Sequence, residues 1–107
     1  MSQISTHILD TSVGRPATGV TVELSLADHV VASGVTDVDG RLMKLGPEHL
    51  EPGTYRLRFA IDEYFQRTGR ESFYPSVSID FWVRDPDEHF HVPLLVSPFG
   101  FSTYRGS

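Results

Sequence analysis

Histidine is the residue type in this chain that is best suited to acid–base chemistry near neutral pH. The sequence holds five histidines and no cysteine, and imidazole is the side chain that ordinarily changes its charge between about pH 5 and pH 8. The lack of cysteine excludes a thiol nucleophile, a cysteine-based zinc site and any disulfide. A catalytic role therefore depends on which histidines face away from the core.

Two strand patterns place histidines on an outer face. In residues 89–97 alternate side chains, beginning with Phe90, are apolar, so His91 points to the opposite face. In residues 4–9 the isoleucines face inward, which leaves His7 outside. Taken singly, each is most simply a solvated surface histidine.

Two short motifs resemble metal sites without completing one. Residues 89–91 read His-Phe-His, which puts two imidazoles on one face, but zinc needs three or four ligands and no H-x-x-x-H motif accompanies them. Residues 37–40 read Asp-Val-Asp-Gly, like the start of a calcium loop, yet the later acidic ligands are missing. The first motif predicts no metal site, and the second is more simply a turn.

Arg41 and the last four residues complete the set of candidates. Arg41 directly follows the turn at 37–40, and the chain ends in Tyr-Arg-Gly-Ser at 104–107. An arginine after a hairpin is usually solvated, and a terminal tetrapeptide is usually frayed. Composition and spacing alone therefore name no reaction.

The elements that must position these residues belong to a single small domain, residues 1–107. The 107 residues support one hydrophobic core, and 39% hydrophobic with 21% charged residues is typical of a folded globular protein. The net charge of −5 opposes binding to nucleic acid or anionic membranes. No apolar run approaches the roughly 20 residues of a membrane span, and residues 1–8 lack the pattern of a signal peptide. We expect a cytoplasmic protein.

Frequent turns indicate many short strands. Nine glycines and seven prolines punctuate the sequence, and residues 62–68 are the one helical candidate, with Asp62 as its cap and Gly69 at its end. A tight reversal is expected at residues 28–29. The pattern predicts an all-β, two-sheet antiparallel sandwich. The expected strands are 4–9, 20–26, 30–36, 41–44, 54–61, 76–83, 89–97 and about 101–105.

Several separated motifs, in one order along the whole chain, resemble the 5-hydroxyisourate hydrolases, which are transthyretin-like enzymes of urate breakdown. The N-terminal signature is matched by ISTHILDT at 4–11 with GRPA at 14–17. The central motif is matched by TDVDGR at 36–41 and a further element by FYP at 73–75. The segment HFHVPLLVSP at 89–98 leads to the closing YRGS.

This resemblance implies a fold, an assembly and a set of site residues. The fold is the transthyretin sandwich of eight strands and a short helix, and the assembly is a homotetramer, a dimer of dimers with active sites where the dimers meet. Outward histidines would then line a pocket between subunits. The implied catalytic residues are His7, Arg41, His91 and Ser107. The substrate is implied to contact these four together with Tyr104, Arg105 and Gly106. His89 is not implicated.

The implied activity is hydrolysis of a cyclic amide bond in 5-hydroxyisourate, giving 2-oxo-4-hydroxy-4-carboxy-5-ureidoimidazoline. His7 and His91 would share water activation and proton delivery, with their order left open. Arg41 would hold carbonyl oxygens through its planar fork. Ser107 and the backbone near Gly106 would orient water or substrate. No metal or organic cofactor is required.

Two other functions are compatible with the same strand pattern. A transthyretin-type carrier would hold a small aromatic hormone in the same fold without chemistry, because one scaffold hosts several functions. The residues at positions 7, 41 and 91 and the YRGS end resemble the hydrolases and differ from the carriers. A sandwich used for adhesion or sugar binding would explain the strands and none of the motifs.

Overall fold

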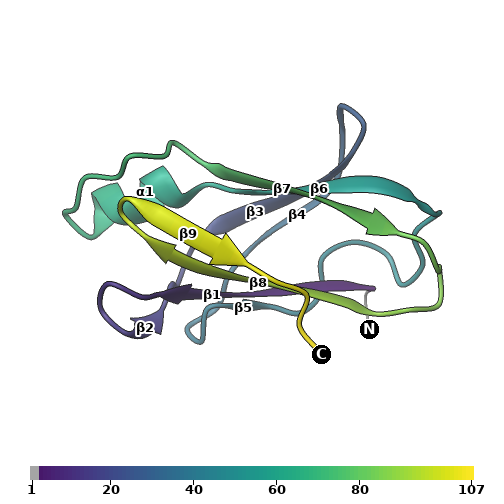
Figure 1. Cartoon of the computed structure of the whole chain (residues 1–107), viewed down its shortest axis with the longest axis horizontal. Helices are drawn as coiled ribbons and strands as arrows, with labels where there is room; N and C mark the ends of the chain where they lie inside the picture. The colour runs from purple at the N-terminus through teal and green to yellow at the C-terminus, as the bar shows by residue number, and fades with distance from the viewer. Residues whose placement is uncertain (1–2) are drawn as a thin grey trace.

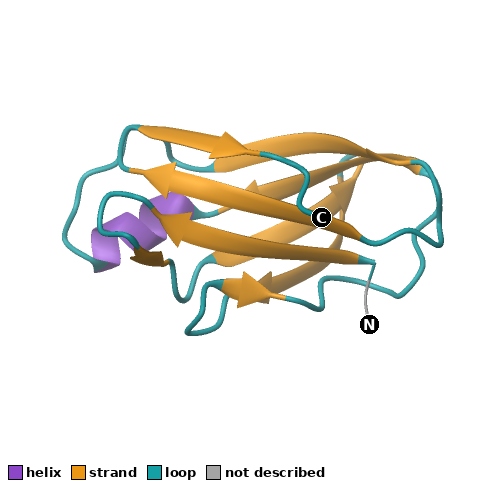
Figure 2. Ribbon diagram, turned by 60° about the horizontal axis from the view of Figure 1, so that its bottom comes forward, coloured by secondary structure: helices purple, strands orange, loops and turns teal. Residues whose placement is uncertain are grey.

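The structure, a computed structural model, describes residues 3–107 as two stacked β-sheets with one short helix at one end (Figures 1 and 2). The two sheets enclose one hydrophobic core. The predicted sandwich with its single helix is therefore confirmed. The described elements are β1 (Ile4–Asp10), β2 (Arg15–Pro16), β3 (Thr21–Leu26), β4 (His29–Val35), β5 (Arg41–Leu42), β6 (Gly53–Phe59), α1 (Ile61–Arg67), β7 (Val77–Val83), β8 (Phe90–Ser97) and β9 (Gly100–Thr103).

The first sheet has β1 at its centre and contains His7, Arg41 and His91 on its strands. Its order is β2-β1-β8-β9, and β5 also pairs with β1. The pairing of β1 with β8 is parallel, whereas the other pairings are antiparallel, so the expectation of a wholly antiparallel sandwich is wrong at this pair. The two strands are far apart in the chain, and the whole second sheet lies between them in sequence. No hairpin links them, so nothing requires them to run in opposite directions.

The second sheet is antiparallel throughout, in the order β4-β3-β6-β7. The reversal between β3 and β4 lies at Ala27 and Asp28, one residue earlier than predicted, and Ala27 adopts a φ of 54°. The pairing of β3 with β4 shifts register between Leu24 and Ser25. This irregularity near the strand end accompanies the 37% exposure of Leu26, which the alternation had placed inside.

The core is built from the alternate apolar residues that the sequence indicates. The inward residues of β1, β6 and β8 are buried, as are Val22 and Leu24 on β3, and both ends of β7 are anchored by buried valines. The largest fully buried side chains are Phe59 and Phe65. Since each strand presents its other face outward, polar residues between these core positions are available to a site.

The helix α1 begins one residue earlier than predicted, and its cap is not Asp62. The N-cap residue is Ala60, with no side-chain hydrogen bond, because Ile61 enters the helix and is fully buried. The carboxylate of Asp62 instead accepts hydrogen bonds from Gln66 Nε2 at 2.9 Å and from Ser72 Oγ at 3.0 Å. Gly69 follows the helix with a φ of 75°, as expected of a terminating glycine.

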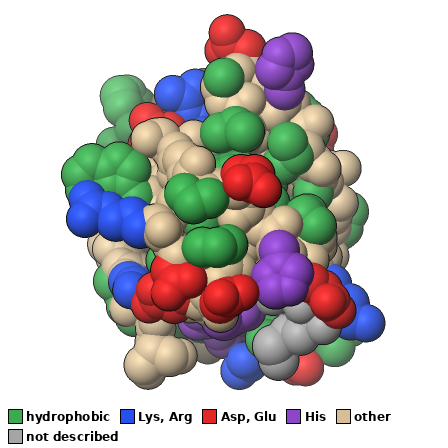
Figure 3. All heavy atoms as spheres, turned by 90° about the vertical axis from the view of Figure 1, so that its right-hand side faces the viewer, with side chains coloured by type: hydrophobic (Ala, Val, Ile, Leu, Met, Phe, Trp, Pro, Cys, Tyr) green, Lys and Arg blue, Asp and Glu red, His purple; other side chains and the backbone are tan. Residues whose placement is uncertain are grey.

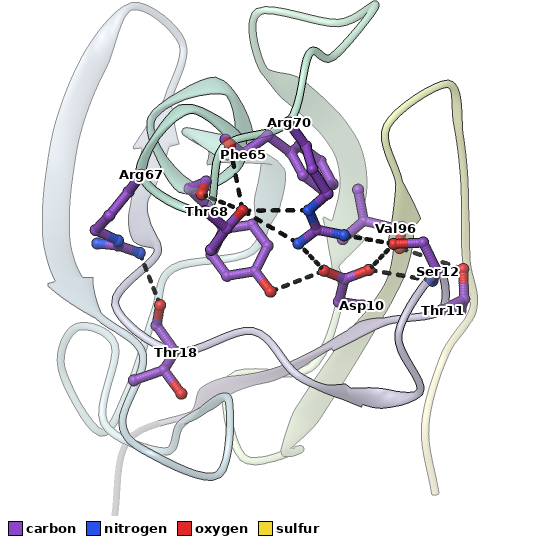
Figure 4. A network of polar contacts seen from close by, with 10 residues as sticks. Asp10, Thr11, Ser12, Thr18, Phe65, Arg67, Thr68, Arg70 and Val96 are labelled. Atoms are coloured by element: carbon purple, nitrogen blue, oxygen red, sulfur yellow. Dashed lines mark hydrogen bonds and ion pairs between the residues drawn. The ribbon is translucent and has the colours of Figure 1, made fainter.

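A buried polar network ties the end of β1 to the segment after α1 (Figure 4). The Asp10 side chain is fully buried, and its Oδ2 accepts hydrogen bonds from Tyr64 Oη at 2.8 Å and from Arg70 Nη2 at 2.6 Å. Its Oδ1 accepts hydrogen bonds from the backbone and the hydroxyl of Ser12. Every carboxylate oxygen is thus satisfied, as burial of a charge requires.

The outer surface carries mixed charge on the end of the sandwich away from α1. Figure 3 shows acidic, basic, histidine and hydrophobic side chains lying side by side on this end. No helix within residues 3–107 has the length and apolar character needed to cross a membrane.

Candidate active site

Strand pairing places His7 and Arg41 next to each other on the first sheet. His7 on β1 is the direct cross-strand partner of Arg41 on β5. His7 is half-buried and Arg41 is exposed. Directly opposite residues in a sheet project to the same side, so the imidazole and the guanidinium share one surface.

The turn at residues 37–40 fixes Arg41 in this position. Asp37 Oδ1 accepts hydrogen bonds from the backbone N–H groups of Asp39 at 2.9 Å and of Arg41 at 3.0 Å. Gly40 has a φ of 71°, its carbonyl accepts a hydrogen bond from Ile8 N at 2.8 Å, and a Cβ atom there would overlap the carbonyl oxygen of Ile8. The segment that resembled a calcium loop is therefore a turn pinned against β1.

The same turn defines the tautomer of His7. Its Nε2 lies 2.9 Å from the backbone carbonyl oxygen of Asp39. A carbonyl oxygen only accepts, so Nε2 carries the proton and donates it. In the neutral ring, Nδ1 is then the nitrogen that can accept a proton or bind a substrate.

His91 joins this surface from the neighbouring strand β8. It pairs in parallel register with Ser5, which lies two residues before His7 on the same face of β1. The His91 Nδ1 atom is 2.8 Å from Ser5 Oγ, so Nε2 is the nitrogen left to face a substrate. Burial, followed by the positive charges of His7, His89 and Arg41, lowers the pKa of His91 below its ordinary value. A lowered pKa keeps this imidazole neutral at pH 7, the form that a general base needs.

The chain end lies against His91 through Gly106. The Gly106 backbone N–H donates to the His91 carbonyl oxygen at 2.8 Å, forming an isolated bridge that extends the sheet. Ser107 is exposed and follows this bridge directly. The last strand ends at Thr103 rather than near residue 105, and the chain continues along β8 in the same antiparallel register to the bridge of Gly106 with His91.

The remaining two members of the closing tetrapeptide point elsewhere in this chain. The Arg105 guanidinium donates to Glu88 Oε1 and lies 4.8 Å from the centre of the Phe90 ring. Tyr104 is 58% exposed. Both line a hollow of about 450 Å³ between the edge strands β7 and β9, and neither His7 nor His91 is among its lining residues.

Ser5 is a residue of this site that was not predicted from the sequence. Ser5 Oγ lies 2.8 Å from His89 Nε2 as well as 2.8 Å from His91 Nδ1, so it joins the two histidines. Strand alternation could have placed Ser5 on the face of His7. Only the unpredicted parallel pairing of β1 with β8 brings Ser5 to His91.

No group of three or more histidine, aspartate or glutamate side chains within residues 3–107 is arranged to hold a metal ion. The arrangement consists of two imidazoles with defined free nitrogens, a guanidinium and a nearby chain end. Together these groups can accept a proton, donate a proton and bind a carbonyl oxygen.

The fold and this surface define a small β-sandwich with an acid–base site on the outer face of one sheet. The family model "HIUase/Transthyretin family" matches residues 4–106, and the chain belongs to that family. The 5-hydroxyisourate hydrolase of Caulobacter vibrioides is 48% identical, with all of both chains covered.

Solved structures show how similar the two branches of this family are in fold. The 5-hydroxyisourate hydrolase of Klebsiella pneumoniae is 46% identical, with a TM-score of 0.93 and all of both chains covered. Transthyretin from Sparus aurata is 29% identical, with a TM-score of 0.92 and coverage of 99% of this chain and 97% of that one. The resemblance drawn from the sequence motifs is thus confirmed.

Proposed function

We propose that this protein is a hydrolase that converts 5-hydroxyisourate to 2-oxo-4-hydroxy-4-carboxy-5-ureidoimidazoline, with residues 1–107 acting as one catalytic domain. The observation that carries the proposal is the convergence of His7, Arg41 and His91 on one outer face of the first sheet. Relatives named for this activity, at 46% and 48% identity over the full chain, support it.

The reaction adds water across a cyclic amide bond. A base removes a proton from water as its oxygen bonds to the carbonyl carbon, and the carbon–nitrogen bond then breaks as an acid protonates the departing nitrogen. His7 and His91 carry out these two proton transfers. The nitrogens available for them are Nδ1 of His7 and Nε2 of His91, since the opposite nitrogens are engaged by Asp39 and Ser5. The nitrogen that acts as the base is bare, and the one that acts as the acid carries a proton.

Arg41 and the chain end stabilise and orient the substrate. The guanidinium of Arg41 holds the purine carbonyl oxygens and balances the negative charge that develops on them. Ser107 and the Gly106 backbone orient water or substrate beside His91. Tyr104 and Arg105 line a separate hollow in this chain, so the proposed substrate contacts of the chain end are those of Gly106 and Ser107. The contact of Arg105 with Glu88 holds the tetrapeptide in place.

The direct test is hydrolysis of 5-hydroxyisourate generated in the cuvette by urate oxidase and followed by ultraviolet absorbance. The purified protein is expected to accelerate decay of the substrate above the spontaneous rate, and a chelator is expected to leave that rate unchanged. A decay equal to that of the enzyme-free control would overturn the proposal.

A transthyretin-type carrier is the second candidate, because transthyretin from Sparus aurata has the same fold. The hydrolase is favoured, since the relatives named as hydrolases are more similar to this chain than that transthyretin is. A carrier would bind an aromatic ligand without turning over 5-hydroxyisourate, so the same assay separates the two.

We propose that the active form is a homotetramer, a dimer of dimers. The edge strands β7 and β9 flank the hollow between the sheets, and the nearby Trp82 and Phe101 are 62% and 42% exposed. Unpaired edges beside exposed aromatic residues favour pairing with a second copy. The outer face with the histidines would then meet a second dimer. We also propose a cytoplasmic location, which suits a chain without cysteine.

The assembly is tested by size-exclusion chromatography with light scattering. The expected mass is about four times that of one chain, consistent with closed symmetry. A monomeric or a dimeric mass would overturn the proposed assembly, because the proposed site lies at the interface where two dimers meet.

A Gly106→Ala substitution is expected to lower kcat for 5-hydroxyisourate roughly 10- to 100-fold while leaving the fold intact. A Cβ atom at position 106 would lie 2.5 Å from Cδ2 of His91, so the imidazole must shift. Gly100→Ala is the matched control, because the added Cβ there meets its neighbour at an ordinary 3.7 Å. Equal activities of Gly106→Ala and Gly100→Ala would show that the close approach of residue 106 to the His91 ring does not require glycine.

A further inference from the structure

Ser5 occupies a position between two histidines that none of the motifs explains. Its hydroxyl oxygen lies 2.8 Å from Nε2 of His89 and 2.8 Å from Nδ1 of His91. Ser5 is fully buried on β1, His91 is half-buried on β8, and His89 is exposed just before that strand. A fully buried hydroxyl with two ring nitrogens at hydrogen-bond distance is a fixed junction between them.

The single proton of the hydroxyl couples the tautomers of the two rings. A serine hydroxyl donates one hydrogen bond, so Ser5 donates to one ring and accepts from the other. If it donates to His91 Nδ1, the neutral His91 carries its proton on Nε2 and has no bare nitrogen for a substrate. If it donates to His89 Nε2, the neutral His91 carries its proton on Nδ1, and its Nε2 is bare.

Only the second arrangement lets His91 act as a base. The bare Nε2 can take a proton from water, and the resulting imidazolium keeps its Nδ1–H bond to Ser5 without rearrangement. His89 is required in this arrangement as the acceptor that holds the Ser5 proton away from His91.

We propose that Ser5 is a positioning residue that, with its hydroxyl proton donated to His89, holds His91 in the Nδ1–H tautomer and so presents Nε2 as the general base. The inference rests on the proposed hydrolase function and assigns the base role to His91. His89, which the family resemblance does not implicate, thereby gains a role.

The proton balance of the step is simple. The water O–H bond breaks as the new carbon–oxygen bond forms, and the proton goes to His91 Nε2. That proton later leaves Nε2 for a nitrogen of the departing group or for His7. The protons on Ser5 and on His91 Nδ1 stay where they are throughout.

The titratable and charged groups around His91 come from several elements. They are His7 on β1, Arg41 on β5 and His89 beside its own strand, while Arg105 on the chain end is paired with Glu88. The positive charge of Arg41 opposes formation of an imidazolium. A hydrogen bond to the Ser5 backbone favours it. A proton shared from Nδ1 to the Ser5 hydroxyl oxygen at 2.8 Å favours it as well, so removal of the hydroxyl should lower the pKa that His91 shows in catalysis.

The test compares Ser5→Ala, Ser5→Thr and Thr6→Val in the full-length protein. Ser5→Thr keeps a hydroxyl at the junction. Thr6→Val is the matched control because Thr6 is equally buried on β1 and also donates to β8, at the Val92 carbonyl oxygen, but from the core face. For each variant kcat and kcat/KM for 5-hydroxyisourate are measured against pH.

Ser5→Ala is expected to lower kcat roughly 10- to 100-fold and to move the acid limb of the kcat/KM profile down by about one pH unit. Ser5→Thr should have the wild-type kcat and the wild-type acid limb. Thr6→Val should leave the pH of the acid limb unchanged. If Ser5→Ala shows the wild-type dependence of kcat/KM on pH, the inference is overturned and the proposed function still stands. If the wild-type protein is inactive, the proposed function is overturned. Equal losses in Ser5→Ala and Thr6→Val with unmoved limbs also overturn the inference.

Nitrogen NMR of the histidine rings supplies a measurement that needs no activity. In the wild-type protein near neutral pH, Nδ1 of His91 is expected to carry a proton and Nε2 to be bare. In His89→Phe the Ser5 hydroxyl loses its acceptor, so the population of this tautomer should fall. A wild-type His91 with a bare Nδ1 overturns the inference.

Discussion

Replacement of His7, Arg41 or His91 by alanine is expected to lower kcat/KM for 5-hydroxyisourate by about 10²- to 10⁴-fold each, with the sandwich still folded. General acid–base groups and preorganised charge stabilisation each contribute rate factors of about this size. All three side chains lie on the outer face of the first sheet, outside the hydrophobic core. Their loss therefore removes chemistry without leaving a cavity in the core.

The measurement is the initial rate of 5-hydroxyisourate decay, with thermal unfolding recorded for each variant. His29→Ala is the matched control, because His29 is exposed on β4 in the other sheet. It should show wild-type kinetics. Wild-type rates for all three site variants would overturn the assignment, whereas a loss of rate accompanied by unfolding of one variant would leave the other two to decide it.

The strand pattern could be predicted because it depends on local alternation. Strands β1, β6 and β8 bury the apolar residues that their sequences indicate, and β6 exposes the polar residues between them. The outward positions of His7 and His91 follow from the same rule. The face of Leu26 could not be predicted in this way, since it depends on an irregularity in the pairing of β3 with β4.

Features that depend on long-range pairing were not visible in the sequence. The parallel contact of β1 with β8 joins segments more than 80 residues apart, and it alone brings Ser5 Oγ to His91 Nδ1. The tautomer of His7 depends on a carbonyl oxygen 32 residues away. The start of α1 was missed for another reason, because burial of Ile61 outweighs the capping preference of Asp62.

The site is thus held by neighbours whose importance only the folded chain reveals. The motifs name His7, Arg41 and His91, but the turn at 37–40 and the hydroxyl of Ser5 determine which nitrogens are free. These supporting residues lie within the motifs, and both Ser5 and Asp39 orient a histidine that belongs to a different motif. This explains in physical terms why the motifs extend beyond the reacting groups.

Asp10→Asn is expected to lower the free energy of unfolding by about 3 kcal/mol at pH 7, a large share of the stability of a small domain. The fully buried carboxylate accepts hydrogen bonds from Arg70, Tyr64 and Ser12. The amide removes the charge that balances the Arg70 guanidinium, whose side chain is only 25% exposed. Urea unfolding at one fixed protein concentration measures the effect. Asp80→Asn, at the exposed pair with Arg56, is the control and should change little.

The pH dependence of this difference follows from the pKa of Asp10. Burial alone would raise that pKa, but the hydrogen bonds from Arg70, Ser12 and Tyr64 outweigh burial and hold it below the ordinary value of 3.8. A carboxyl with a lowered pKa contributes its stability fully above its unfolded-state value and loses it as pH falls through the lower folded-state value. The gap between wild type and Asp10→Asn should therefore be constant near neutral pH and shrink below about pH 4. A gap that stays the same on acidification would show that the network acts through packing rather than through the charge of Asp10.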